Sequence, residues 1–127
     1  IHLDGLYKDP EMSRVSNFRA WFDGFPTLRF ILAHMNFHDP QEALDICSDF
    51  PSLFVDTSWQ PSEVIAEAVR RIGSKRILLG SDWPLMGANI PTSIQRVRDI
   101  TKFEFCSDED VRRILGENAQ GILEGAP

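Results

Sequence analysis

The sequence of 127 residues has few cysteines, few histidines and no long apolar run. Its two cysteines, Cys47 and Cys106, lie far apart in stretches with helical patterning, which argues against a disulfide framework or a four-thiolate zinc site. The longest clear apolar run, residues 30–33, falls far short of the roughly 20 residues that a membrane span needs. We therefore expect a soluble protein of a reducing compartment, the cytoplasm, with no membrane partner.

Basic residues are in the minority. Thirteen Lys and Arg stand against nineteen Asp and Glu, which gives a net charge of -6. A nucleic-acid surface needs clustered cations that neutralise phosphates, so we expect no nucleic-acid partner. The remaining composition, 43% apolar and 25% charged residues, is that of a globular protein, and we interpret residues 1–127 as a single domain or part of one.

Three short apolar runs, residues 28–33, 53–55 and 77–79, recur about every 25 residues, as expected for repeated strand-helix units. Residues 1–3 resemble the end of a fourth run. Because the runs are continuous rather than alternating, they suit strands that are buried on both faces of a parallel sheet. Pattern alone does not separate them from buried helix, so the segments between them decide.

The segments between the runs have helical patterning with recognisable ends. At the start of one, Asp39 is placed to cap, Pro40 takes the first helical position and Glu42 completes a capping box. A second helix, with an apolar stripe along residues 65–72, ends at Gly73. Further helices are predicted at residues 18–25, at residues 92–100 and from residue 107, with a short closing turn at residues 118–123.

Alternating strands and helices predict an α/β fold with a parallel sheet. Two architectures remain open. One is an open, doubly wound sheet, and the other is part of a closed (β/α)₈ TIM-type barrel, whose eight units normally take about 250 residues. Four units in 127 residues correspond to about half of such a barrel.

Polar residues follow each apolar run. His2 lies within residues 1–3, and His34 follows the run 28–33. Residues 56–58 follow the run 53–55, and Asp82 comes soon after the run 77–79. Because the carboxyl ends of parallel strands meet at one edge of the sheet, His2, His34 and Asp82 can converge there. Imidazole and carboxylate groups are ligands for zinc or a similar divalent ion.

Four segments carry a resemblance to a known family: FILAHM at 30–35, LFVDTS at 53–58, RILLGSDWP at 76–84, and Asn118-Ala119. In this order they resemble the C-terminal half of the amidohydrolase superfamily, and within it the amidohydrolase-2 group of metal-dependent hydrolases and decarboxylases. The resemblance implies a (β/α)₈ barrel of which this chain forms roughly units five to eight.

The resemblance also implies roles. His2 would be the metal-ligating histidine of the fifth strand, His34 the histidine of the sixth and Asp82 the aspartate of the eighth. Asp82 would touch a divalent ion, zinc in the first instance, and accept a proton from the attacking water. His34 would bind a second metal ion or stabilise the transition state. The family's paired first-strand histidines, His-x-His, have no counterpart, because the only histidines of the sequence are His2, His34 and His38.

The incomplete ligand set leaves two interpretations of the chain. Either it is a piece of a longer protein, which the absence of an initial methionine favours, or it is a natural half barrel. The leading function is that of an enzyme, an amidohydrolase-type hydrolase or decarboxylase that acts on a small molecule. One alternative is a non-catalytic half-barrel module that forms a homo-oligomer or pairs with another chain. The other is a phosphate-binding TIM-barrel enzyme, which the scarcity of glycines near the strand ends disfavours.

Each candidate residue also has a structural interpretation. His34 could be a buried histidine held by a backbone group, and Asp82 could begin a turn. His38 is expected to be a loop histidine, and residues 56–58 are expected to shape the rim of the site. Trp59, Trp83 and Met86 are candidates for the wall of an apolar pocket, although aromatic residues near strand ends more often pack against their neighbours.

Overall fold

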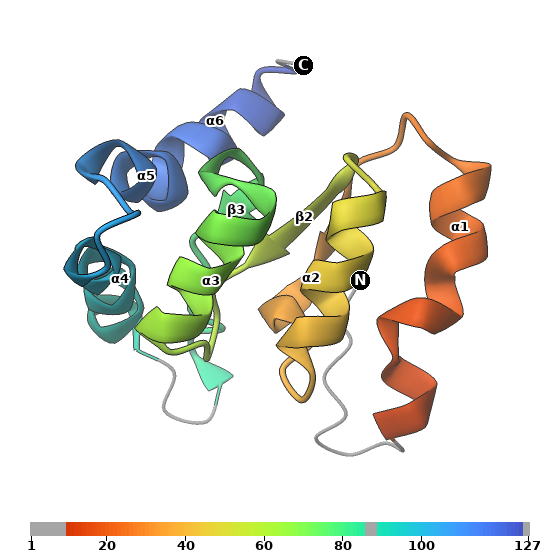
Figure 1. The fold of residues 1–127 in the computed structure, drawn as a ribbon, viewed down its shortest axis with the longest axis horizontal. Helices are drawn as coiled ribbons and strands as arrows, with labels where there is room; N and C mark the ends of the chain where they lie inside the picture. The colour runs from red at the N-terminus through yellow and green to blue at the C-terminus, as the bar shows by residue number, and fades with distance from the viewer. Residues whose placement is uncertain (1–9, 86–88, 126–127) are drawn as a thin grey trace.

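The computed structural model of this chain describes residues 10–85 and 89–125. Its centre is a parallel sheet of three strands, β1 (Phe30–Leu32), β2 (Leu53–Asp56) and β3 (Ile77–Leu78), which lie side by side in the order β1-β2-β3 (Figure 1). In the register, Leu32 lies opposite Val55, and Val55 lies opposite Ile77. The three predicted strands and their parallel pairing are thus confirmed. The strand predicted at residues 1–3 lies outside the described residues.

Helices connect and flank the strands. The crossovers are α2 (Pro40–Asp49), between β1 and β2, and α3 (Ser62–Ile72), between β2 and β3. The helix α1 (Arg19–Gly24) precedes β1, and α4 (Ile90–Arg98), α5 (Asp108–Arg112) and α6 (Asn118–Leu123) follow β3 (Figure 1). Single turns of 3₁₀-helix lie at Pro10–Ser13, Val15–Phe18, Ala33–Met35, Ser74–Arg76 and Asp99–Lys102, and a π-helical turn spans Arg113–Glu117. In the part of the chain that the structure describes, no helix is long and apolar enough to cross a membrane.

The helix ends follow local sequence signals, with one exception. Asp39 caps α2 through its Oδ1, which accepts a hydrogen bond from the Glu42 N–H at 3.0 Å. The prediction that Glu42 completes a capping box was wrong, because its carboxylate instead accepts hydrogen bonds from the Val15 N–H at 3.2 Å and the Ser16 hydroxyl at 2.8 Å. A tertiary contact to the segment before α1 thus replaces a local one. At the end of α3, Gly73 adopts the positive φ of 77° that favours glycine.

The core lies on one face of the sheet. Leu53 and Val55 of β2 are fully buried, together with the apolar stripe of α3 that the sequence predicted. On the other face, Ile31 is 38% exposed and Phe54 is half-buried. The expectation that the strands are buried on both faces is therefore met for β3, where Ile77 and Leu78 are both buried, but not for β1 and β2, because α2 and α3 cover only one face.

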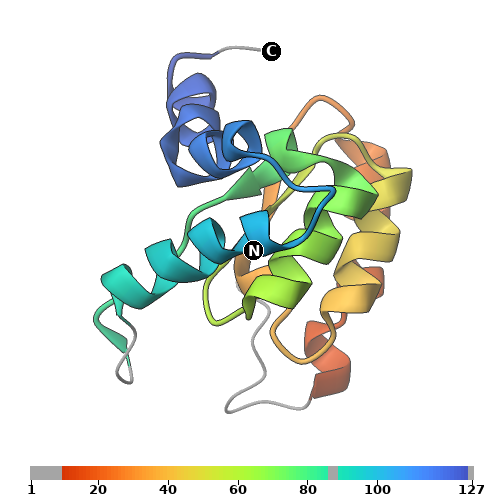
Figure 2. The ribbon, with the colours of Figure 1, turned by 60° about the vertical axis from the view of Figure 1, so that its left-hand side comes forward.

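The last helix is tied to the beginning of the last strand. The side-chain amide of Asn118, at the start of α6, donates hydrogen bonds to the carbonyl oxygens of Ser74 and Ile77, at 2.7 and 2.8 Å. These bonds hold α6 at the end of the sheet where β3 begins (Figure 2). The loops that follow the strands lie at the opposite end of the sheet, where the strands end.

Candidate functional site

The loops after the three strands meet at one edge of the sheet. A single turn of 3₁₀-helix carrying His34 follows β1, β2 ends at Asp56, and β3 is followed by the segment that carries Asp82. Because the strands are parallel and paired in sequence order, β2 separates the other two strands at this edge. The residues after β1 and β3 therefore meet above the end of β2.

His34 is held in place by the end of β2. Its backbone N–H donates a hydrogen bond to Asp56 Oδ2 at 3.1 Å, and its carbonyl oxygen accepts one from the side-chain amide of Gln60 at 2.6 Å. The residue is 3% exposed and has a φ of 57°, in the left-handed region. Its imidazole Nε2 lies 3.6 Å from Asp82 Oδ1. That distance is longer than an ordinary hydrogen bond, so the two groups face each other without closing one.

Asp82 uses its two carboxylate oxygens differently. Oδ1 faces His34, and Oδ2 accepts a hydrogen bond from the indole N–H of Trp59 at 2.8 Å. The carbonyl oxygen of Asp82 accepts a hydrogen bond from the Leu85 N–H, which makes the residue the start of a turn as well. The turn chemistry and the inward carboxylate therefore coexist at one residue. The contact with Trp59 is one that the sequence pattern did not indicate.

Backbone strain gathers at this edge of the sheet. Within residues 10–85 and 89–125, every non-glycine residue with a positive φ lies in one of the three loops after the strands; they are His34, Met35, Asn36, Trp59 and Asp82. A left-handed backbone is unfavourable for residues that carry a Cβ, and it persists only where surrounding contacts enforce it. Such residues concentrate at binding and catalytic sites, so the strain independently points to this edge.

Residues 56–58 shape the rim of the site. The carboxylate of Asp56 accepts hydrogen bonds from two backbone N–H groups, those of His34 and of Ser58, at 3.1 and 2.8 Å. The Thr57 hydroxyl accepts one from the Gly80 N–H at 3.1 Å. A Cβ at Gly80 would lie 2.3 Å from Ser58 Oγ, so only glycine lets the loop after β3 approach the end of β2 this closely.

The other candidates contribute less. His38 lies in the loop before α2, where its ring packs against Phe37 with centroids 5.1 Å apart, so it shares no helix with His34. Trp83 is 65% exposed. His2 and Met86 lie outside the described residues.

The His34–Asp82 pair fits a metal ion as two of its ligands. Two donor atoms that each lie about 2.1 Å from a tetrahedral zinc ion are about 3.4 Å apart, close to the separation of Nε2 and Oδ1. The described residues contain no group of three His, Cys, Asp or Glu side chains that could complete such a site. His2, the further ligand that the family resemblance implies, lies outside residues 10–85 and 89–125.

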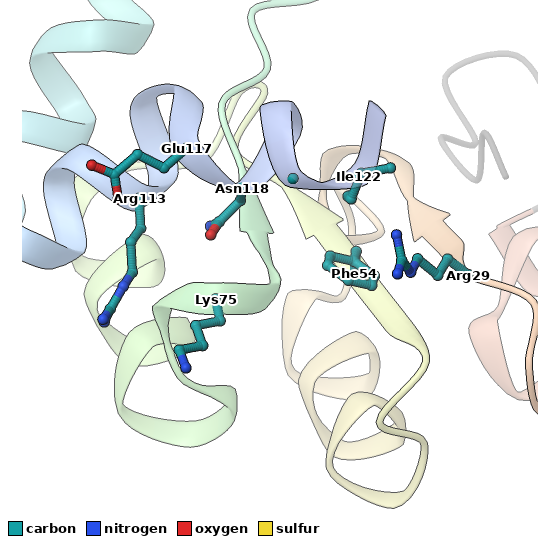
Figure 3. Close-up of a pocket in the computed structure, with 8 residues that line it drawn as sticks. Arg29, Phe54, Lys75, Arg113, Glu117, Asn118 and Ile122 are labelled. Atoms are coloured by element: carbon teal, nitrogen blue, oxygen red, sulfur yellow. The ribbon is translucent and has the colours of Figure 1, made fainter. Parts of the chain in front are cut away.

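A cavity of about 220 Å³ lies at the opposite end of the strands, between α6 and β2. Figure 3 shows Phe54, Asn118 and Ile122 around it, with the basic side chains of Arg29 and Lys75 nearby. Arg29 precedes β1, and Lys75 precedes β3. The cavity therefore belongs to the amino ends of the strands and is separate from the His34–Asp82 pair.

Similar solved structures share this fold. A manganese-bound dihydroxybenzoic acid decarboxylase from a Polaromonas species matches 90% of this chain and 40% of its own, with a TM-score of 0.64 and 23% identity. A zinc-bound amidohydrolase from Burkholderia multivorans matches 90% of this chain and 50% of its own, with a TM-score of 0.68 and 15% identity. A 2,6-dihydroxybenzoate decarboxylase from Rhizobium matches 81% of this chain and 36% of its own, with a TM-score of 0.59 and 23% identity.

These matches establish the fold and show what share of each solved protein the chain covers. The chain spans 36 to 50% of the length of the three proteins, so its three parallel strands correspond to part of their architecture. No curated protein matches the sequence. The amidohydrolase family, in contrast, is matched over residues 11–124, nearly the whole chain. The resemblance seen in the sequence motifs is thereby confirmed: the chain belongs to the amidohydrolase family.

Proposed function

We propose that this chain forms units five to eight of a (β/α)₈ barrel that catalyses metal-dependent hydrolysis or non-oxidative decarboxylation of a small molecule. The observation that carries the proposal is the convergence of His34 Nε2 and Asp82 Oδ1, 3.6 Å apart, at the carboxyl ends of the strands. Active sites of (β/α)₈ barrels lie at this end. Family membership and the share of the solved relatives that the chain covers support the same proposal.

The uncovered face of the sheet supports the barrel. In a closed barrel, alternate residues of each strand point inward and pack against side chains from the other strands. Ile31 and Phe54 stand on the face opposite the core and are the inward-pointing residues on this interpretation. The remaining units of the barrel would cover them.

A divalent metal ion would be held by His34 and Asp82, and by His2 according to the family resemblance. When bound, such an ion supplies positive charge that polarises a carbonyl group or acidifies a water molecule. Manganese and zinc are present in two of the similar structures, which supports either ion as the cofactor. Zinc remains our first choice for the imidazole and carboxylate pair.

The side chains of Asp82 and His34 would accept and donate the protons of the reaction. In hydrolysis, the Asp82 carboxylate accepts a proton from the attacking water, and the Trp59 indole holds its Oδ2 in place. The imidazole of His34, when it is not a metal ligand, donates a hydrogen bond to the oxygen that gains negative charge. In decarboxylation, the bond to CO₂ breaks, its electron pair stays on the substrate carbon, and that carbon takes up a proton, for which Asp82 is the proposed donor.

The substrate we propose is a small carboxylated, aromatic or lactone-like molecule, and the solved decarboxylases of dihydroxybenzoates support the aromatic carboxylates among these. We also propose that the protein works in the cytoplasm, without a nucleic-acid or membrane partner, as a homo-oligomer.

Native mass spectrometry of the full-length protein tests the proposal first, because one spectrum reports chain mass, assembly state and bound metal. A chain near twice 14.5 kDa that carries zinc or manganese supports it. Metal-free 14.5 kDa chains would instead favour the non-catalytic half-barrel module. A second experiment tests for decarboxylation. We expect the metal-loaded protein to release CO₂ from 2,6-dihydroxybenzoate and the Asp82→Ala variant to release none.

A further inference from the structure

We propose that Trp59 is a positioning residue for Asp82, whose indole N–H fixes one carboxylate oxygen so that the other is presented toward His34 and a bound metal ion. This inference rests on the proposed function, because it assigns Asp82 Oδ1 to the metal. It adds a residue from the loop after β2 to a site otherwise built from the loops after β1 and β3.

The geometry separates the two carboxylate oxygens of Asp82. Trp59 Nε1 lies 2.8 Å from Oδ2, a normal length for a hydrogen bond from N–H to a carboxylate. Oδ1 lies 3.6 Å from His34 Nε2. A carboxylate can rotate about its Cβ–Cγ bond and exchange its oxygens, but the indole bond selects one orientation. A group that is held in advance loses less entropy when it binds a ligand.

Both ends of this contact have unfavourable backbone conformations. The φ of Trp59 is 65° and that of Asp82 is 58°, which is left-handed for two residues that carry a Cβ. The two strained residues meet through a side-chain hydrogen bond, one of the contacts that can hold such conformations in place.

The loop that carries Trp59 is itself fixed. Ser58, directly before it, is 3% exposed and donates its backbone N–H to Asp56 Oδ1 at 2.8 Å. Gln60, directly after it, is 4% exposed and donates its side-chain amide to the His34 carbonyl at 2.6 Å. Both neighbours of Trp59 are therefore tied to the backbone of His34, Gln60 directly and Ser58 through the shared Asp56 carboxylate, which gives the indole N–H a defined direction.

The first experiment measures metal affinity. The variant Trp59→Phe keeps an aromatic ring and removes the N–H donor. We expect its dissociation constant for Mn²⁺ or Zn²⁺, from calorimetric titration of the full-length protein, to rise about 10-fold, the lower end of the range for residues that orient metal ligands. The matched control is Trp21→Phe, at a tryptophan on α1 that is 61% exposed, and its affinity should equal that of the wild type. Unchanged affinity in a folded Trp59→Phe variant would overturn the inference.

A second experiment needs neither metal nor a Trp59 variant. In the full-length wild-type protein, the Trp59 indole proton should resonate downfield of those of the exposed Trp21 and Trp83 and exchange more slowly with solvent. Substitution Asp82→Ala removes the acceptor, so the Trp59 signal should shift upfield and exchange faster, while the Trp21 signal stays unchanged. An indole proton of Trp59 that Asp82→Ala leaves unchanged would contradict the inference.

The two experiments separate this inference from the proposed function. A wild-type protein that binds no metal contradicts the metal-dependent function and, with it, the role of Trp59 in presenting Oδ1 to a metal ion. If the wild type binds metal and only the Trp59→Phe result is negative, the proposed function stands and the positioning role is rejected.

Discussion

His34 and Asp82 face each other across the end of a strand that contributes neither of them. Nε2 and Oδ1 lie 3.6 Å apart above β2, whose last residue, Asp56, holds the backbone of His34 at 3.1 Å. The middle strand thus acts as the support on which the loops of its two neighbours are aligned. Its contribution can be tested separately from that of the facing pair.

Replacing Asp82 tests the facing pair directly. We expect Asp82→Ala to abolish turnover by the full-length protein, because it removes both the proton acceptor and a metal ligand. The measurement is the steady-state rate with any substrate that the wild type converts. Asp23→Ala, at an exposed position on α1, is the control and should keep full activity. Activity retained by Asp82→Ala would refute the proposed mechanism.

The close approach of the loop after β3 predicts an effect of Gly80→Ala. The added Cβ would meet Ser58 Oγ at 2.3 Å and Asp56 Oδ1 at 2.5 Å, and the Asp56 carboxylate is held by the N–H groups of His34 and Ser58. We expect the free energy of unfolding to fall by about 1–3 kcal/mol, the usual cost of overpacking. Urea denaturation measures it.

A second glycine provides the control for this experiment. Gly116 lies in the π-helical turn Arg113–Glu117, and a Cβ there would meet no atom within 4 Å. Gly116→Ala should therefore raise the stability by about 0.5–1 kcal/mol, because alanine loses less backbone entropy than glycine in a helix. Equal effects of the two substitutions would contradict the packing argument.

The double role of Asp56 predicts that Asp56→Ala is costly. The substitution leaves the N–H groups of His34 and Ser58 without their acceptor, and each unsatisfied buried donor costs about 1–3 kcal/mol. Asp49→Ala is the comparison, since it breaks an exposed ion pair with Arg19 and should cost at most about 1 kcal/mol. Thermal unfolding of both variants checks the ranking, and a smaller effect at Asp56 would disprove it.

The capping box of α5 predicts a dependence of stability on pH. Burial alone would raise the pKa of the Asp110 carboxyl, but hydrogen bonds from Ser74 and Ser107 outweigh it and hold the pKa below its usual value. The resulting stabilisation is present above the unfolded pKa of about 4 and is lost as the pH falls through the lower pKa of the folded state.

The variant Asp110→Asn isolates this contribution. The difference in unfolding free energy between wild type and variant should be largest near pH 6 and shrink below about pH 4, where the unfolded carboxyl is protonated. Denaturation at a series of pH values measures it. A difference that stays constant from pH 6 to pH 3 would show that the carboxylate charge is not the cause.

The buried thiol of Cys47 predicts low reactivity. Burial raises the pKa of this thiol to about 12, although Arg76 and Arg71 nearby act in the opposite direction. At pH 8 the thiolate, which is the reactive form, is therefore about one part in ten thousand. Maleimide should label Cys47 only after denaturation, as mass spectrometry of the digested protein can show. Fast labelling of the folded protein would contradict this burial.

Local signals in the sequence predicted most of the elements that carry the site. Asp39 and Pro40 marked the start of α2, Gly73 marked the end of α3, and the apolar runs marked the three strands. Each signal depends on backbone conformation or on side chains within a few residues, so it can be read without knowing the fold. The strand-end position of His34 and Asp82 could be read in the same way, and their roles as ligands stay predictions.

The contacts that define the site depend on tertiary structure. Nothing in the local pattern shows that the indole of Trp59 reaches Asp82, or that Gly80 must lack a Cβ to fit beside Ser58. The carboxylate of Glu42 likewise accepts a hydrogen bond from the Val15 N–H and does not form the predicted capping box. The sequence by itself determined the order of strands and helices and the family, because these depend on short-range pattern. Only the tertiary structure decided which side chains meet, because the partners come from different loops that parallel pairing brings to one edge.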